Sequence, residues 1–327
     1  MGKLYYLHSM TPNENQNKEE LLAVDCSHVT KIFGASFKAL DDVSLQIKKG
    51  TLFGLIGADG AGKTTLIRIL ASLLLPTEGE VKVLGYDVHK DFRKLRHYIG
   101  YMPGKFSLYS DLSVNENLNV FATLYGTKME TNYELFSDLY EQLAPFGKRK
   151  AGNLSGGMKQ KLALCCALVH RPDILLLDEP TTGVDPVSRK VFWDILTRLR
   201  KEFKMPIIVS TPYMDEAFRC DRVALIQNGK IISEDNPQGL VNSYPYKLWG
   251  VLSVQKGKMI KELRSLTGVQ SVYSFGDTLH LTFDESCLST EEIVCRMQEK
   301  GFKDITIKAI DPTIEDYFLA KTVEEKE

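Results

Sequence analysis

The feature that most constrains this chain is a glycine-rich segment placed between an apolar strand and a helix. Residues 57–64 fit the pattern G-x-x-x-x-G-K-[ST]. The nearly all-apolar run Leu52–Ile56 directly before it predicts a strand buried on both faces. Lys63–Leu75 has helical periodicity and is followed by Pro76. A strand, this loop and a helix in that order predict a phosphate-binding loop rather than a glycine-rich turn without a ligand.

The residue types in this loop suit a polyphosphate. Glycines let the backbone wrap closely around phosphate oxygens, and successive N–H groups at the start of the helix point at the anion. We expect Lys63 to place a positive charge near the β- and γ-phosphates, and Thr64 to offer a hydroxyl to Mg²⁺. The residues expected to bind nucleotide here are Gly57, Ala58, Asp59, Gly60, Ala61, Gly62, Lys63, Thr64 and Thr65.

A second apolar strand delivers two carboxylates. The run Ile174–Leu177 leads into Asp178 and Glu179. Because ligands of α/β sheets bind at the carboxyl ends of strands, Asp178 is expected to join Thr64 at the metal. Glu179 is then placed to orient or deprotonate a water that attacks the γ-phosphate. The expected catalytic residues are therefore Glu179, Lys63 and Asp178, although two adjacent carboxylates can also form a solvated turn.

Strands alternate with helices along much of the chain, which favours an α/β fold with a mostly parallel sheet. Asn228–Gly229 lies between two apolar runs and predicts a tight hairpin, and so an antiparallel portion. The further strands expected in this part are Val43–Ile47, Asp173–Leu177, Pro206–Ser210, Val223–Gln227 and Lys230–Ser233.

Changes in pattern along the chain predict three parts. Residues 1–20 are polar without periodicity and are expected to form a flexible tail. Residues 21–241 form the nucleotide-binding part, with a helical insertion at about 90–160 that holds the capping box Ser113-x-x-Glu116. Residues 242–327 are expected to form a small α+β domain with the order βαββαβ, which is ferredoxin-like. Its expected elements are Leu252–Val254, Met259–Leu266, Val269–Ser274, Leu279–Phe283, Thr290–Lys300 and Ile305–Ile310.

Composition excludes two classes of function. The net charge of −1 over 327 residues provides no basic field for nucleic acid. The longest uncharged apolar run, Leu162–Val169, has eight residues, whereas a membrane span needs about 20. We therefore expect no membrane-spanning helix and no nucleic-acid partner.

The segment Leu154–Gln160, which reads LSGGMKQ, joins these two motifs in an order that closely resembles the ATP-binding cassette (ABC) family over roughly residues 22–240. Gly183–Pro186 is similar to that family's D-loop. Phe33 lies 57 − 33 = 24 residues before the phosphate loop, like the aromatic residue that stacks on adenine, and Phe37 is the alternative. The C-terminal segment 312–318 is similar, more weakly, to the end of drug- and multidrug-exporting cassettes.

The resemblance implies an ATPase subunit of an exporter that uses ATP and Mg²⁺. In this family two cassettes enclose two ATP molecules head to tail, so Ser155, Gly156 and Gly157 would contact the γ-phosphate held by a partner cassette. A separate membrane permease would dock near Phe106–Leu118, and the chain would lie peripherally on the cytoplasmic face of the membrane. A soluble ABC protein acting on ribosomes or DNA is the alternative class, but no second cassette or zinc-type cysteine pattern favours it.

Two positions depart from the family pattern. Gly104 stands where the family usually has the glutamine that contacts Mg²⁺ and the attacking water. Pro212 stands where the family has a histidine, and proline has neither an imidazole nor a backbone N–H. These departures predict a cassette that binds ATP, hydrolyses it poorly and completes a partner's site in a heterodimer. A homodimer that turns over slowly is the alternative.

Overall fold

The computed structural model describes residues 22–324, so the tail expected at residues 1–20 lies outside the described part. The chain divides between Gln238 and Gly239 into two compact units. We call residues 22–238 the first unit and residues 239–324 the second unit. Each is described separately below.

A six-stranded, mostly parallel sheet forms the centre of the first unit, with strand order β10-β9-β3-β8-β7-β6. All neighbours are parallel except β10 and β9, which form the hairpin expected at Asn228–Gly229. β3, β7 and β8 are buried at every residue, which explains their apolar sequences. The strands are β3 (Leu52–Ile56), β6 (Ile99–Met102), β7 (Ile174–Asp178), β8 (Ile207–Thr211), β9 (Arg222–Gln227) and β10 (Lys230–Asp235).

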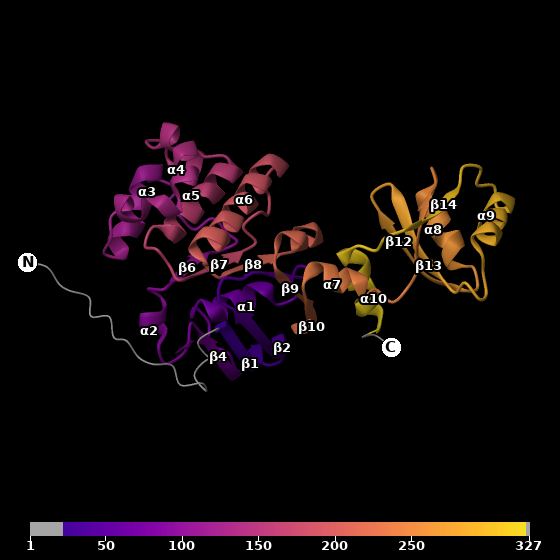
Figure 1. Cartoon of the computed structure of the whole chain (residues 1–327), viewed down its shortest axis with the longest axis horizontal. Coiled ribbons are helices and arrows are strands. Elements are labelled where there is room, and N and C mark those ends of the chain that lie inside the picture. The colour runs from indigo at the N-terminus through magenta and orange to yellow at the C-terminus, as the bar shows by residue number, and fades with distance from the viewer. Residues whose placement is uncertain (1–21, 325–327) are drawn as a thin grey trace, which may run out of the picture. The chain divides into compact units, whose positions relative to one another are not determined.

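An antiparallel sheet of order β2-β1-β4-β5 adds a second layer. Its strands are β1 (Leu22–Phe33), β2 (Phe37–Lys48), β4 (Glu78–Val83) and β5 (Tyr86–Asp87). Helix α1 (Lys63–Leu70) packs against both sheets, and one continuous apolar core joins residues of β1, β2, α1 and the parallel sheet. In Figure 1, α1 and the antiparallel sheet lie on one side of the parallel sheet and α5 and α6 on the other. The expected P-loop α/β fold with an antiparallel portion is confirmed.

Most of the remaining helices of the first unit lie between β6 and β8 in the sequence. The Ser113–Glu116 capping box is present: the Glu116 amide donates to Ser113 Oγ at 3.2 Å, and the Ser113 amide donates to Glu116 Oε2 at 2.7 Å. The helical insertion, however, does not fill residues 90–160, because β6 within that range belongs to the parallel sheet. The helices are α2 (Phe92–Leu95), α3 (Val114–Leu124), α4 (Ser137–Leu143), α5 (Gly156–Leu168) and α6 (Pro186–Phe203), with 3-10 turns at Met129–Leu135, Ala144–Phe146, Ala151–Asn153 and Met214–Arg219. Helix α7 (Pro237–Asn242) includes the boundary between the two units.

The second unit has a sheet of order β12-β13-β11-β14 in which every neighbouring pair is antiparallel. With the element order βαββαβ, this is the ferredoxin-like arrangement. Helices α8 and α9 cover one face of the sheet, where Met259, Leu263, Ile293 and Met297 pack on Leu279 and Leu281. The elements are β11 (Leu248–Leu252), α8 (Lys256–Arg264), β12 (Val269–Phe275), β13 (Thr278–Phe283), α9 (Thr290–Glu299), β14 (Thr306–Ile310) and α10 (Ile314–Glu324).

Several expected elements differ in their bounds from those in the structure, and for two of them the structure gives the reason. α1 ends at Leu70 and not at Leu75, because Ser72 adopts a left-handed backbone with a φ of 55°. Arg96 holds this end of the helix by donating to Ser72 Oγ at 3.0 Å and to Ser72 O at 2.6 Å. The first strand of the second unit is Leu248–Leu252 and not Leu252–Val254, because its pairing with β13 and β14 runs from residue 248 to residue 252.

Candidate functional site

The loop of residues 57–62 joins β3 to α1 and can be built only with glycine at two positions. A Cβ on Gly57 would lie 2.1 Å from the Ile226 carbonyl oxygen. Gly62 caps α1 with a φ of 110°, and a Cβ there would lie 2.5 Å from the Ala39 carbonyl oxygen. The backbone of the loop therefore packs directly on β2 and β9, and its path is fixed from behind.

Lys63 is the cation of this loop, and its side chain is 3% exposed. Its Nζ donates to the carbonyl oxygens of Gly57 at 2.9 Å and Ala58 at 3.0 Å. The same Nζ lies 3.4 Å from Glu179 Oε1. The buried charge is thus balanced by a carboxylate from the end of β7 and held in the centre of the loop.

Asp178 is buried at the end of β7, and two hydroxyls converge on one of its oxygens. Thr64 Oγ1 donates to Asp178 Oδ1 at 3.0 Å, and Ser210 Oγ from β8 donates to the same atom at 2.7 Å. A carboxylate and a threonine hydroxyl at this distance form the oxygen-donor set that Mg²⁺ prefers. These two residues therefore fit the metal expected from the sequence.

Glu179 follows Asp178 in a left-handed backbone conformation with a φ of 49°. Its amide donates to the Ser210 carbonyl oxygen at 3.0 Å and to Ser210 Oγ at 3.1 Å, which holds this uncommon conformation in place. The side chain is 24% exposed and reaches toward Lys63. A carboxylate in this position can accept a proton from a water beside the phosphate loop.

The expected aromatic residue lies at the tip of the β1–β2 hairpin, where Phe33 pairs with Phe37. The side chain of Phe33 is 41% exposed and that of Phe37 is 63% exposed. Lys31 Nζ lies 5.3 Å from the centre of the Phe33 ring. Both rings are therefore free to stack on a base, and both stay candidates.

The expected signature residues 155–157 are not linked to the cluster of Lys63, Asp178 and Glu179. Ser155 caps α5, where its Oγ accepts from the Met158 amide at 3.4 Å, and Ser155 and Gly156 are exposed. A Cβ on Gly157 would lie 2.8 Å from Ser188 Oγ, so the segment packs on the start of α6 beside Asp185. No hydrogen bond among residues 22–324 links Ser155 to the phosphate loop.

The two departures from the family pattern follow β6 and β8, the two strands on either side of β7. A Cβ on Gly104 would lie 3.1 Å from the Asp178 carbonyl oxygen and 3.7 Å from Asp178 Oδ2. A longer side chain at this position would therefore reach the metal ligand. Pro212 directly follows Thr211, the last residue of β8.

One residue of this region was not predicted as functional. Glu216 is 2% exposed and accepts hydrogen bonds from Thr181 Oγ1 at 2.7 Å, Trp193 Nε1 at 3.0 Å and Thr211 Oγ1 at 2.6 Å. Arg189 Nε lies 3.7 Å from it. Glu216 thus ties the loop after Glu179 to the end of β8 and to α6. In the sequence it is one of several acidic residues after Pro212, and only the burial distinguishes it.

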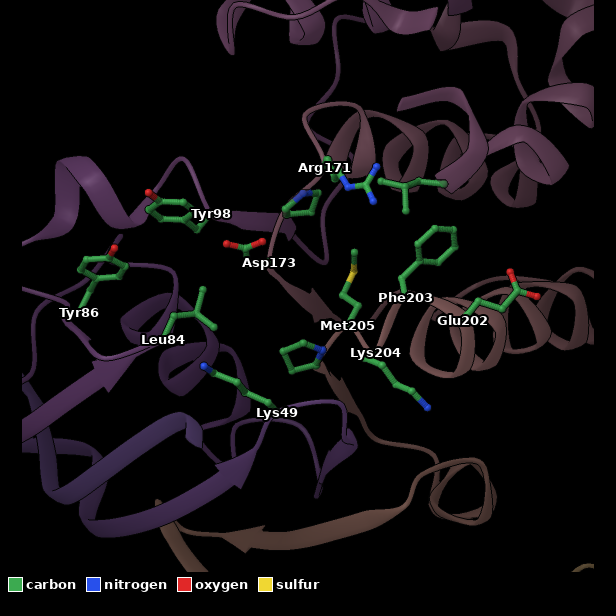
Figure 2. Close-up of a pocket in the computed structure, with 13 residues that line it drawn as sticks. Lys49, Leu84, Tyr86, Tyr98, Arg171, Asp173, Glu202, Phe203, Lys204 and Met205 are labelled. Atoms are coloured by element: carbon green, nitrogen blue, oxygen red, sulfur yellow. The ribbon is translucent and has the colours of Figure 1, made fainter. Parts of the chain in front are cut away.

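A separate cleft of about 690 Å³ lies at the opposite end of the parallel strands (Figure 2). Lys49, Asp173 and Pro206 line it, and these residues come immediately or shortly before β3, β7 and β8. Ligands of open α/β sheets bind at the carboxyl ends of the strands, where Lys63 and Asp178 lie. The phosphate loop, and not this cleft, is therefore the candidate nucleotide site.

Comparisons with known proteins agree with this geometry. The family model described as ABC transporter matches residues 40–182. A "probable multidrug ABC transporter ATP-binding protein" of Escherichia coli (strain K12) is 39% identical over 290 residues, which are 88% of this chain and 49% of that protein. The chain thus spans about half the length of that relative.

In two further comparisons, the aligned region covers nearly all of the similar protein. "Nod factor export ATP-binding protein I" of Sinorhizobium fredii (strain NBRC 101917 / NGR234) is 33% identical over 320 residues, 96% of this chain and 90% of that protein. A solved dimeric ATP-binding cassette in a post-hydrolysis state, bound to ADP and Pi, is 28% identical with a TM-score of 0.59, over 65% of this chain and 98% of that one. The chain therefore belongs to the ABC transporter family, as one of its ATP-binding cassettes.

Proposed function

We propose that this chain is the ATP-binding subunit of an exporter, and that it binds Mg²⁺–ATP and hydrolyses it to drive a separate permease. The observation that carries the proposal is the convergence of Lys63, Thr64, Asp178 and Glu179 at the carboxyl ends of β3 and β7. The names of the relatives, multidrug transport and Nod factor export, support export as the direction.

Each residue of the cluster has a distinct task. Lys63 would exchange its carbonyl partners for the β- and γ-phosphate oxygens of ATP. Thr64 and Asp178 would hold Mg²⁺, which neutralises charge on the phosphates when bound. Glu179 would orient the attacking water and accept its proton. Phe33 or Phe37 would stack on the adenine.

A second cassette is the proposed partner on the open side of the site. Ser155 and Gly156 stand exposed at the N-terminus of the 13-residue helix α5. A helix N-terminus with small residues favours an anion, and here it would meet the γ-phosphate on the partner's phosphate loop. The ADP-bound neighbour was solved as a dimer, which supports this arrangement.

The permease is proposed to dock on the helical side of the first unit. An apolar cavity of about 350 Å³ lies there, and Leu73, Phe121, Tyr125, Ala167 and His170 are among its lining residues. Among residues 22–324, no helix has both the length and the apolar character that a membrane span requires. We propose a peripheral position on the cytoplasmic face of the membrane, held by the permease, as the likeness to exporter cassettes suggests.

Calorimetry on the purified chain tests nucleotide binding at this loop. Lys63→Ala should lower the affinity for Mg²⁺–ATP by 100-fold or more, roughly the effect of one lost charge contact to phosphate. Lys49→Ala is the matched control, since Lys49 lines the cleft at the other end of the sheet. Unchanged affinity in Lys63→Ala, or an equal loss in both variants, would refute the assignment.

The second candidate function is a cassette that binds ATP but completes only its partner's active site. Gly104 and Pro212 favour it, because neither offers the side-chain donor that the family has at its position, and Gly104 lies beside Asp178. Loss of one preorganised donor typically costs about 10²–10³ in rate. The exposed Ser155 cap remains intact and could serve a partner's site.

Two substitutions distinguish a hydrolysing cassette from a degenerate one. If the ATP site built by this chain's own phosphate loop is impaired, Ser155→Arg should abolish the ATPase rate of the assembled transporter. Glu179→Gln should then change that rate by less than about threefold. Glu179→Gln in a Gly104→Gln, Pro212→His background should then become strongly inhibitory. Fast hydrolysis by the isolated wild-type chain, stopped by Glu179→Gln, would instead establish the first candidate.

A further inference from the structure

The second unit contains a cavity that the proposed ATPase function does not use. Its volume is about 320 Å³, within the range of small-molecule sites. It lies on the face of the sheet opposite to α8 and α9: Leu279, Leu281 and Phe283 of β13 join the core, whereas the alternate residues His280 and Thr282 line the cavity. Residues from α10 and from the segment before β11 complete the wall.

A buried histidine and carboxylate lie in this wall. The side chains of His280 and Asp316 are 10% and 2% exposed, and His280 Nδ1 lies 2.7 Å from Asp316 Oδ1. The other carboxylate oxygen accepts from the Thr313 amide at 2.8 Å and from Thr313 Oγ1 at 2.7 Å. Because a carboxylate only accepts, Nδ1 carries the hydrogen of this contact, and in the neutral imidazole Nε2 of His280 is then an acceptor. Nε2 has no hydrogen-bond partner among the described residues.

The remaining wall contains three tyrosines and charge of one sign only. Three phenol rings, those of Tyr244, Tyr246 and Tyr273, line the cavity together with Asp316, and no lysine or arginine is among the lining residues. Burial raises the pKa of Tyr244, and the Asp316 carboxylate raises it further, so this phenol stays uncharged. The cavity therefore combines aromatic ring faces, one carboxylate and one unpartnered acceptor.

We propose that this cavity binds a small organic cation, namely a protonated amine attached to a flat apolar body. The ammonium group donates to His280 Nε2 and is balanced by Asp316, while the tyrosine rings attract the charge and pack on the apolar body. A carboxylate ligand of the same shape is excluded, because it would bring a second negative charge beside Asp316 and offer no donor to Nε2.

The probe is tryptamine, titrated into the full chain by calorimetry. Two analogues of similar shape test the chemistry: 3-(indol-3-yl)propanoate reverses the charge, and N,N,N-trimethyltryptammonium keeps the charge but has no N–H to donate. We expect saturable 1:1 binding of tryptamine, about tenfold weaker binding of the trimethyl analogue and no saturable binding of the propanoate. Equal binding of tryptamine and either analogue, or no saturable binding of tryptamine, would overturn the proposal.

Two variants of the cavity wall test whether tryptamine binds there. They leave the His280–Asp316 pair intact, because its loss would unfold the start of α10. Tyr273→Leu and Tyr246→Leu should each weaken tryptamine binding about tenfold. Tyr86→Leu is the matched control, since Tyr86 lines the cleft of the first unit. An unchanged circular-dichroism spectrum in all three variants shows that both units fold, which Mg²⁺–ATP binding, a property of the first unit, does not test. Competition between tryptamine and Mg²⁺–ATP, or unchanged binding in both cavity variants, would overturn the proposal and leave the ATPase function untouched.

Discussion

At the scale of single residues, Glu216 holds together three segments that carry the candidate site. Its carboxylate accepts from Thr181, which follows Glu179 by two residues, from Thr211 at the end of β8 and from Trp193 on α6. An unpaired buried donor costs about 1–3 kcal/mol. The position therefore matters for stability and for the placement of Glu179, although Glu216 has no proposed contact with nucleotide.

Glu216→Ala should lower the free energy of unfolding by on the order of 3 kcal/mol, because it leaves three buried donors without an acceptor. Glu216→Gln keeps one oxygen acceptor and should lose about half as much. Urea denaturation measures both. Asp215→Ala changes the exposed neighbouring carboxylate and should stay within about 0.5 kcal/mol of the parent. Equal urea midpoints for Glu216→Ala and Asp215→Ala would contradict the stabilising role of Glu216.

At the scale of elements, the sequence was enough to predict features whose pattern lies within one short segment. Fully buried strands such as Leu52–Ile56 are apolar at every position, and the hairpin at Asn228–Gly229 follows from two residues whose φ values are 48° and 80°. The same holds for the phosphate loop, whose glycines and lysine all lie within residues 57–63. These features could be predicted because the residues that identify each of them lie within one short segment of the sequence.

Features set by distant residues could not be predicted. The end of α1 depends on Arg96, which binds Ser72 from another helix, and apolar periodicity continues past that point. The role of Glu216 depends on partners from three elements. Whether Phe33 or Phe37 is the stacking residue depends on a ligand position that neither the sequence nor the hairpin determines.

A histidine where α3, α5 and β6 pack together should destabilise the folded state when it is protonated. His170 follows α5, stacks on Tyr125 at 3.7 Å between ring centres and donates from Nε2 to the Ile99 carbonyl oxygen at 3.1 Å. Its Nδ1 is buried without a partner among the described residues. Burial lowers the pKa of His170 from 6.5 to about 4.

Because the folded pKa of His170 is below the unfolded value, the unfolded state binds more protons between about pH 6.5 and pH 4. His170 should therefore lower the free energy of unfolding as the pH falls through this window, by up to about 3 kcal/mol, and should have no effect above it. Denaturation at a series of pH values measures this. His170→Gln should flatten the dependence, whereas the exposed His89→Gln should not. An equal slope in His170→Gln would refute the prediction.

At the scale of the whole molecule, the first unit, which contains the candidate nucleotide site, and the second unit have separate apolar cores. Every contact described above for Lys63, Asp178 and Glu179 comes from residues of the first unit, and the core around Met259 and Leu281 comes from the second. A chain that ends at Gln238 should therefore bind Mg²⁺–ATP within about threefold of the full-length affinity. Calorimetry measures this, and a loss of 100-fold or more would show that the second unit supports the site.

The packing of the phosphate loop also sets the order in which the site can form during synthesis. β3 lies between β8 and β9, and Gly57 rests on Ile226 while the Gly229 amide donates to the Ala61 carbonyl oxygen at 2.9 Å. All of these supports leave the ribosome long after the loop itself. A nascent chain that displays the whole motif therefore still lacks the residues on which the loop packs. We expect the candidate site to take its final form only after residues near 229 have been made, long after the loop itself was translated.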